Sequence, residues 1–298
     1  MDKMRFDLIR IGTLFVCLLS TSLLVQAQRI PIQNRGSDSM AIAVSAWSEA
    51  YQKIDPEVGI AVSGGGSGTG IAALINGLVD IANASRPLTT KERMLAKKAQ
   101  RDPIEHIVGY DAVAIYLHKD NPLKALSFTQ LGGLFGRGGA TKKWTDLGIE
   151  VPGCKDQKII LVSRQSSSGT YAYFRKIVIG EKYRNKYKPE ILSTQSSKDL
   201  VELIGNTPCA IGYSSYAYHT PEVKAVCLLQ QDTESCLEYA AESASKEATY
   251  PLIRPLYMYT DGEPNGKIKA YISWVLSKEG QCVLSGLNYT PVDEVNCQ

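Results

Sequence analysis

The stretch SRQSSSGT at residues 163–170 organises our interpretation of this chain. The apolar run IILV at residues 159–162 comes directly before it and is typical of a buried strand. Tyr171, Phe174 and Val178 follow it at the spacing of one helix face. Residues 163–170 are therefore predicted to form a loop that leaves a strand and opens a helix.

This loop offers hydrogen-bond donors and positive charge. The first N–H groups of a helix have no internal partner, and the helix dipole is positive at that end. The guanidinium of Arg164 and the hydroxyls of Ser168 and Thr170 add to those N–H groups. The natural ligand of such a set is a small anion. Taken alone, however, the loop could equally be a capped turn.

Two further loops of this kind come earlier in the chain. Residues 35–39, RGSDS, precede a helix whose apolar face starts at Met40, and Asp38 or Ser39 is its expected N-cap. Residues 63–70, SGGGSGTG, separate a short strand from another helix, and their glycines let backbone N–H groups approach a ligand closely. Capping alone would explain one such loop, but three of them indicate an anion site.

Residues 80–88 are predicted to contain a short strand that ends in Ser85 and Arg86. With the preceding strand, glycine loop and helix it forms a βαβ unit, and ligands bind at the carboxyl ends of such strands. Arg86 is expected either in the site or as a surface ion-pair partner. The glycine loop fits no dinucleotide, P-loop or nucleophile-elbow pattern, because residues such as Thr69 stand where a glycine is required.

The remaining pattern alternates strands and helices, which predicts an α/β fold. The expected elements are strands at 104–117, 209–213 and 251–259, an exposed helix within 89–103, a glycine-rich loop at 132–139 and a last helix from 268 that Gly280 ends.

The N-terminus resembles a secretory signal peptide. Basic residues precede a mostly apolar segment at 11–25, and Val25 and Ala27 fit the two positions that a signal peptidase reads. We expect residues 1–27 to be removed, so that the mature chain begins at Gln28. The 271 residues that remain of 298 suffice for one large or two smaller cores.

Charge and composition exclude several classes of protein. The chain has 33 basic and 30 acidic residues, a net charge of +3, and no basic run that would indicate a nucleic-acid partner. No segment after residue 27 is long and apolar enough to suggest a membrane span. His106, His118 and His219 are scattered, so we expect neither a metal site nor a cofactor.

Six cysteines follow residue 27, an even number that suggests disulfides in an exported chain, although six allow 15 connectivities. The pairs Cys227–Cys236 and Cys282–Cys297 would close short loops, which costs little loop entropy. Cys154 and Cys209 would then pair by elimination.

The chain resembles the phosphate-binding subunit of bacterial phosphate ABC importers, a type II periplasmic binding protein. The matching stretches, in the expected order, are GSDSM (36–40), GGGSGTGIAAL (64–74), DIANASRPL (80–88), VGYDAVAIYLHKDNP (108–122), LFGRGGATKKWTDLG (134–148), SRQSSSGT (163–170), AIGY (210–213), RPLYMYT (254–260) and SKEGQ (277–281). The resemblance implies two α/β lobes that close on phosphate, with two hinge strands crossing between them. Lobe 1 would comprise residues 28–112 and 252–298, and lobe 2 residues 113–251.

The resemblance also implies site residues. Ser39 and Ser67 match first-lobe donors to phosphate, whereas the matching second-lobe residues are Arg164, Ser168, Gly169 and Thr170.

The chain departs from some relatives at two positions of this site. Some have an aspartate where Arg86 stands, which accepts the ligand's hydrogen, and others have an aspartate at Ser166 that holds the arginine. Asp38, and after it Asp111, is our candidate for a replacement acceptor.

The expected function is phosphate binding outside the cytoplasmic membrane, in the periplasm, and delivery to an ABC permease by a monomer. Sulfate or molybdate are alternative ligands. A secreted phosphate-ester hydrolase with Ser67 or Ser168 as nucleophile is an alternative of another class, but no histidine stands in a predicted site loop to act as its base. A surface sensor or adhesin is a third.

Overall fold

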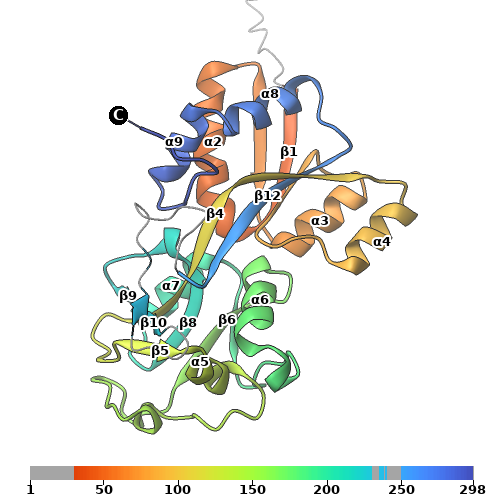
Figure 1. The fold of residues 1–298 in the computed structure, drawn as a ribbon. Helices are drawn as coiled ribbons and strands as arrows, with labels where there is room; N and C mark the ends of the chain where they lie inside the picture. Colours follow the sequence, from red (N-terminus) through yellow and green to blue (C-terminus); the bar gives the residue numbers. More distant parts are fainter. Residues whose placement is uncertain (1–29, 230–234, 238, 240–249, 298) are drawn as a thin grey trace, which may run out of the picture.

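The computed structural model describes residues 30–229, 235–237, 239 and 250–297, and these form two lobes of mixed helix and strand (Figure 1). The main sheet has nine strands in the order β2-β1-β3-β12-β4-β8-β6-β7, with β9 paired to β4. In Figure 1 the first lobe contains both the early segments in red and orange and the last segments in blue, so the chain enters it twice.

The first lobe is built from βαβ units. Its strands are β1 (Ile30–Gly36), β2 (Val58–Ser63), β3 (Ile81–Ala84) and β12 (Ile253–Asp261). Its helices are α2 (Ala41–Ile54), α3 (Ser67–Ile75), α4 (Thr90–Lys98), α8 (Gly266–Val275) and α9 (Lys278–Ser285), with a 3₁₀ turn η1 at Asp38–Met40. Strand β1 pairs in parallel with both β2 and β3, so the carboxyl ends of all three strands meet at one edge.

The second lobe repeats this arrangement. Its strands in the main sheet are β6 (Ile160–Arg164), β7 (Leu192–Thr194), β8 (Ala210–Ser215) and β9 (Val223–Ala225). A separate sheet joins β5 (Ala125–Ser127), β10 (Cys227–Leu229) and β11 (Cys236–Leu237). Its helical segments are α5 (Phe128–Phe135), η2 (Trp144–Leu147), α6 (Gly169–Phe174), η3 (Arg175–Ile179), η4 (Glu181–Tyr183), α7 (Ser197–Gly205) and η5 (Tyr216–Tyr218).

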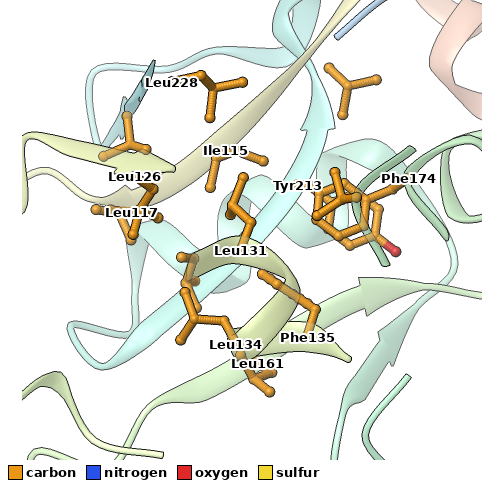
Figure 2. Packing of buried hydrophobic residues seen from close by; sticks show 14 of the residues in the cluster. Ile115, Leu117, Leu126, Leu131, Leu134, Phe135, Leu161, Phe174, Tyr213 and Leu228 are labelled. Carbon is orange, nitrogen blue, oxygen red and sulfur yellow. The ribbon is translucent and has the colours of Figure 1, made fainter. Parts of the chain in front are cut away.

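Each lobe has an apolar core of its own. Figure 2 shows the second-lobe core, where Leu131 and Phe135 of α5 meet Ile115 and where the rings of Phe174 and Tyr213 stack 3.7 Å apart. In the first lobe, Trp47 of α2 is fully buried among apolar side chains of the strands and of the C-terminal helices. Burial of these side chains is the main force that holds each lobe together.

Strand β4 (Pro103–His118) joins the two lobes. Up to Ala112 it pairs with β12, and from Val113 onward it pairs with β8 (Figure 1). The partner strand changes within one continuous strand, so a small change of backbone angles near residues 112–113 would reorient one lobe against the other.

Two expectations about glycines are wrong. Gly132 lies inside helix α5 and not in a loop. The ring of Tyr183 packs so close to it that there is no room for a Cβ. Gly280 does not end the last helix. Helix α8 is followed by α9, and Gly280 lies within α9, where a Cβ would clash with the carbonyls at the end of α8.

The three expected disulfides are present in the structure. Their Cα–Cα distances are 5.1 Å for Cys154–Cys209, 5.6 Å for Cys227–Cys236 and 5.4 Å for Cys282–Cys297. Each pair joins segments that already neighbour one another in the fold. The expected signal peptide lies outside the described residues, and no helix among those described is long and apolar enough to cross a bilayer.

We expect the protein without residues 1–27 to show no free thiols when it is denatured but not reduced. The reason is that its six remaining cysteines would all be paired in an oxidising compartment. Thiol titration before and after reduction is the measurement, with reduction releasing all six. Free thiols before reduction would contradict the pairing.

Candidate functional site

The predicted anion loops meet where the two lobes face each other. The loops after β1, β2 and β3 contribute Ser39, Ser67 and Ser85 from the first lobe. The loop after β6 contributes Ser168 and Thr170 from the second. All five side chains are buried.

The first-lobe hydroxyls form a connected network. Ser67 Oγ accepts a hydrogen bond from the backbone N–H of Ser85 at 3.1 Å. Ser37 Oγ donates to Ser85 Oγ at 2.9 Å. Ser67 Oγ and Ser85 Oγ are 3.4 Å apart, and either can be the donor. Since each hydroxyl has one hydrogen and two acceptor lone pairs, Ser67 keeps its own hydrogen for another partner when Ser85 is the donor.

The second-lobe loop opens α6 as predicted. Ser168 is the N-cap, and its Oγ accepts from the N–H groups of Thr170 at 3.2 Å and Tyr171 at 3.4 Å. The hydroxyl hydrogen of Ser168 is not used by these bonds, so Ser168 can cap the helix and still donate to an anion.

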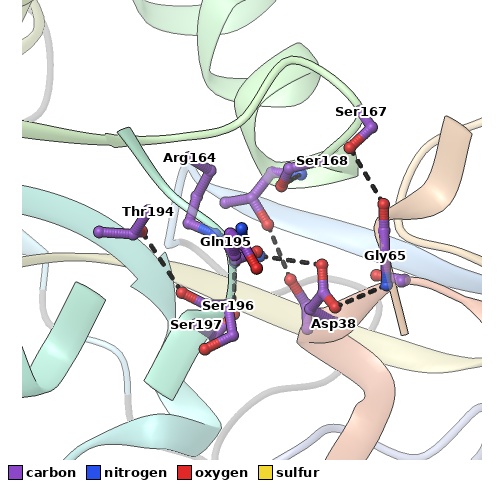
Figure 3. A network of polar contacts seen from close by, with 12 residues as sticks. Asp38, Gly65, Arg164, Ser167, Ser168, Thr194, Gln195, Ser196 and Ser197 are labelled. Carbon is purple, nitrogen blue, oxygen red and sulfur yellow. Dashed lines mark hydrogen bonds and ion pairs between the residues drawn. The ribbon is translucent and has the colours of Figure 1, made fainter. Parts of the chain in front are cut away.

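Arg164 lies at the end of β6 and is fully buried. Its Nη1 donates to Ser197 Oγ at 2.6 Å, and its Nη2 donates to the carbonyl of Gln195 at 2.8 Å and to Asp38 Oδ2 at 3.1 Å (Figure 3). Its Nε, also buried, has no hydrogen-bond partner among the described residues. A buried charged donor without a partner costs free energy unless a ligand satisfies it.

Asp38 does not cap a helix, contrary to expectation. The cap position of the 3₁₀ turn is Ser37, and Asp38 makes no capping bond. Its Oδ1 accepts from the N–H of Gly65 at 3.0 Å, and its Oδ2 pairs with Arg164. The carboxylate that holds Arg164 is therefore that of Asp38, and Ser166 is exposed.

Direct contacts already join the two lobes across the site. The hydroxyl oxygens of Ser39 and Thr170 are 2.7 Å apart. The N–H of Gly68 donates to the carbonyl of Ser167 at 2.9 Å, and Ser167 Oγ donates to the carbonyl of Gly65 at 3.0 Å. The structure is therefore that of a closed arrangement, in which the loops of the two lobes contact each other directly.

Arg86 is held in an ion pair and does not direct its charge toward the loops of the site. Its Nη1 and Nη2 donate to the two carboxylate oxygens of Glu92 at 2.8 and 2.7 Å. The structure thus favours the ion-pair interpretation, because the charge of Arg86 is already compensated beside the loops.

Sequence reasoning missed one arginine of the site. Arg254 on β12 is 1% exposed and donates to both Ser39 Oγ, at 3.0 Å, and Thr170 Oγ1, at 2.9 Å. Its charge is paired with Asp111 at 2.7 Å. The available signal was an arginine within an apolar strand-like run, since such a charge needs a buried partner.

Burial shapes the electrostatics of these groups. Desolvation lowers the pKa of the Arg164 guanidinium from its ordinary value, Asp38 opposes this shift, and the charge of Arg254 adds to it. Burial also raises the pKa of the Asp111 carboxyl, against the opposing effect of Arg254. Each of these two neighbouring buried cations is thus offset by one buried or part-buried carboxylate.

The histidines do not supply a base for the hydroxyls of the site. His106 contacts Thr260, His118 lies near Asp120, and His219 stacks on Tyr216. Among the described residues there is also no group of three or more histidine, cysteine, aspartate or glutamate side chains that could hold a metal ion.

Two lobes joined by crossing strands, with donors from both around one position, define a substrate-binding protein of the periplasmic type. The model of the PBP superfamily domain matches residues 25–279. The phosphate-binding protein PstS of Pseudomonas aeruginosa is 32% identical over 268 residues, which cover 86% of this chain and 81% of that protein. PstS of Bacillus subtilis is 30% identical over 87% of this chain and 80% of its own length.

Solved structures agree with this match. A putative phosphate ABC transporter substrate-binding protein of Clostridium perfringens, with bound phosphate, has a TM-score of 0.74 at 26% identity and covers 89% of this chain and 100% of that one. An ABC-type phosphate transport receptor of Vibrio cholerae has a TM-score of 0.66 at 27% identity, covering 87% and 99%. The chain belongs to the PBP superfamily and, within it, to the phosphate-binding proteins of bacterial phosphate ABC transporters.

Proposed function

We propose that this protein binds inorganic phosphate outside the cytoplasm and delivers it to an ABC permease. The observation that carries the proposal is the buried Arg164, whose Nε is unpartnered among the described residues. Thr170 of the same loop contacts Ser39 of the other lobe at 2.7 Å. Charge-assisted and hydroxyl donors from two lobes can surround a tetrahedral oxyanion on several sides.

The same proposal includes the setting in which the protein works. Residues 1–27 would be removed on export, and the mature monomer would act in the periplasm. Its lobes would be residues 28–112 with 252–298, and residues 113–251, hinged where β4 changes its partner strand. Ligand would stabilise the closed state by bridging them, and the permease would recognise that state.

Binding without turnover distinguishes this proposal from a secreted hydrolase. No histidine is hydrogen-bonded to Ser67 or Ser168 in the described part of the chain, so neither hydroxyl has a base of that kind. Isothermal calorimetry with phosphate, sulfate and molybdate, together with an assay of phosphate-ester hydrolysis, tests the proposal. We expect one phosphate per protein and no hydrolysis, whereas turnover or a preference for sulfate would contradict it.

Asp38 is our candidate for the group that distinguishes phosphate from sulfate. At neutral pH phosphate still carries a proton, which a carboxylate can accept in a hydrogen bond, whereas sulfate oxygens can only repel that carboxylate. We therefore expect Asp38→Asn to weaken phosphate binding and to let sulfate compete. The measurement is phosphate affinity with and without excess sulfate.

Asp80→Asn is the matched control for this experiment. Asp80 also accepts a backbone N–H, that of Gln33 at 2.7 Å, but it lies before β3, at the opposite end from Ser85. The control should bind phosphate as the wild type does. Normal phosphate affinity and undiminished rejection of sulfate by Asp38→Asn would show that the proton is read elsewhere.

A further inference from the structure

Arg254 lies on β12, close to the point at which β4 changes its partner strand from β12 to β8. It stands opposite Asp111 in the antiparallel register of β12 and β4, and both residues are 1% exposed. Its Nε and Nη2 donate to Asp111 Oδ2 at 3.1 and 2.7 Å. Ser215, the last residue of β8, donates to Asp111 Oδ1 at 2.6 Å. The guanidinium is thus held in place by residues of the hinge.

The guanidinium of Arg254 also donates to one hydroxyl from each lobe. Its Nη2 donates to Ser39 Oγ at 3.0 Å and to Thr170 Oγ1 at 2.9 Å. The ring of Tyr173 in α6 covers its face, with the centroid 5.6 Å from Cζ. These contacts with Thr170 and Tyr173 come from the second lobe, so they form only while the lobes are together.

The chemistry of these groups restricts where the hydroxyl hydrogens can point. A guanidinium only donates, and Nη2 has two hydrogens for Asp111 Oδ2 and the two hydroxyls, so Arg254 faces a lone pair of each hydroxyl oxygen and shares a hydrogen among these acceptors. The two hydroxyl oxygens are also 2.7 Å apart, so one hydroxyl donates to the other and only the second hydrogen is directed elsewhere. An oxyanion accepts on every unprotonated oxygen, and it can take that second hydrogen and replace the bond between the two hydroxyls. Donors oriented in advance bind an anion more tightly than freely rotating ones.

We propose that Arg254 is a positioning residue of the anion site. The ion pair with Asp111 fixes its guanidinium, and the guanidinium orients the hydroxyls of Ser39 and Thr170 as donors to phosphate only in the closed state. This inference rests on the proposed phosphate binding. It assigns Arg254 and Asp111 a role in affinity and in closure, beyond that of a buried ion pair in the hinge.

Arg254→Lys tests the role, because lysine keeps the charge and can still pair with Asp111 but lacks the rigid fork in which Nε holds Asp111 while Nη2 reaches the hydroxyls. We expect phosphate binding, measured by calorimetry, to weaken by about tenfold or more, as for the loss of a charge-assisted hydrogen bond. Small-angle scattering should show less closure at the same phosphate concentration. Thermal unfolding should remain near that of the wild type.

Arg101→Lys is the matched control. Arg101 pairs with Asp261 at the far end of the same strand, β12, and is partly exposed. The Arg101→Lys variant should bind phosphate as the wild type does.

A double-mutant comparison with Thr170→Val provides a readout that a merely structural role of Arg254 would not change. If Arg254 acts through Thr170, then Arg254→Lys should cost much less affinity in the Thr170→Val background than in the wild type.

The outcomes separate the two proposals. If the wild type does not bind phosphate, both the proposed function and this inference are wrong. If the wild type binds and Arg254→Lys binds equally well, or if its effect is simply additive with that of Thr170→Val, only this inference is wrong. Should Arg254→Lys fail to fold, Asp111→Asn removes the ion pair that fixes Arg254 while keeping Arg254 itself. Phosphate affinity of wild-type strength in that variant would overturn the inference.

Discussion

Arg164→Ala is expected to abolish most phosphate binding. The guanidinium is buried, its Nε is unpartnered among the described residues, and it is the charged group of the second-lobe loop. Loss of a charged donor in a buried site costs about 2 kcal/mol or more, which is roughly thirtyfold in Kd. Calorimetric titration with phosphate is the measurement. Arg164→Lys should recover only part of the affinity, because lysine cannot donate two parallel hydrogen bonds.

Arg86→Ala is the control for this result. Arg86 carries the same charge beside the same loops, but Glu92 holds it in an ion pair. We expect its removal to change phosphate affinity much less than that of Arg164. Equal losses in the two variants would indicate a general effect of positive charge, and wild-type affinity in Arg164→Ala would remove Arg164 from the site.

Gly169→Ala is expected to prevent closure of the lobes. Gly169 begins α6 in the second lobe, and a Cβ there would lie closer to the hydroxyl oxygens of Ser67 and Ser85 than van der Waals contact allows. Both serines belong to the first lobe, so the added methyl group acts as a wedge between the lobes. Overpacking of this kind costs about 1–3 kcal/mol, or roughly 5- to 150-fold in Kd.

Gly286→Ala is the matched control, because the nearest atom to its added Cβ would be 3.5 Å away, an ordinary contact. Small-angle scattering with and without phosphate is the measurement, together with calorimetry. The wild type and Gly286→Ala should become more compact with phosphate, and Gly169→Ala should not. Normal closure of Gly169→Ala would show that the first-lobe serines do not meet α6 in solution.

The anion loops could be predicted from the sequence because each combines local signals. A strand, a run of glycine and hydroxyl residues and the start of a helix lie next to one another in the chain at residues 63–70 and 163–170. The role of Ser168 as N-cap is a local property of this kind. Short-range disulfides such as Cys227–Cys236 were predictable for the same reason, since little chain has to be closed.

Contacts between distant residues were harder to predict. Arg254 stands in an apolar run, and its partner Asp111 lies 143 residues away, so that only the pairing of β12 with β4 reveals the ion pair. The position of Asp38 beside Arg164 depends on how the lobes close, whereas local sequence suggested a helix cap. Strand β1 was not predicted, because polar residues interrupt the alternation of its apolar residues. In the structure it nevertheless pairs with a strand on each side.

Native mass spectrometry of freshly purified mature protein tests the central claim most directly. A site with a buried arginine and enclosing loops from two lobes should retain its ligand through a gentle purification. We expect a population whose additional mass corresponds to one phosphate, which disappears after partial unfolding and dialysis and returns when phosphate is added. A mature protein that carries no phosphate and takes up none at saturating concentration, while it is folded, would contradict the account.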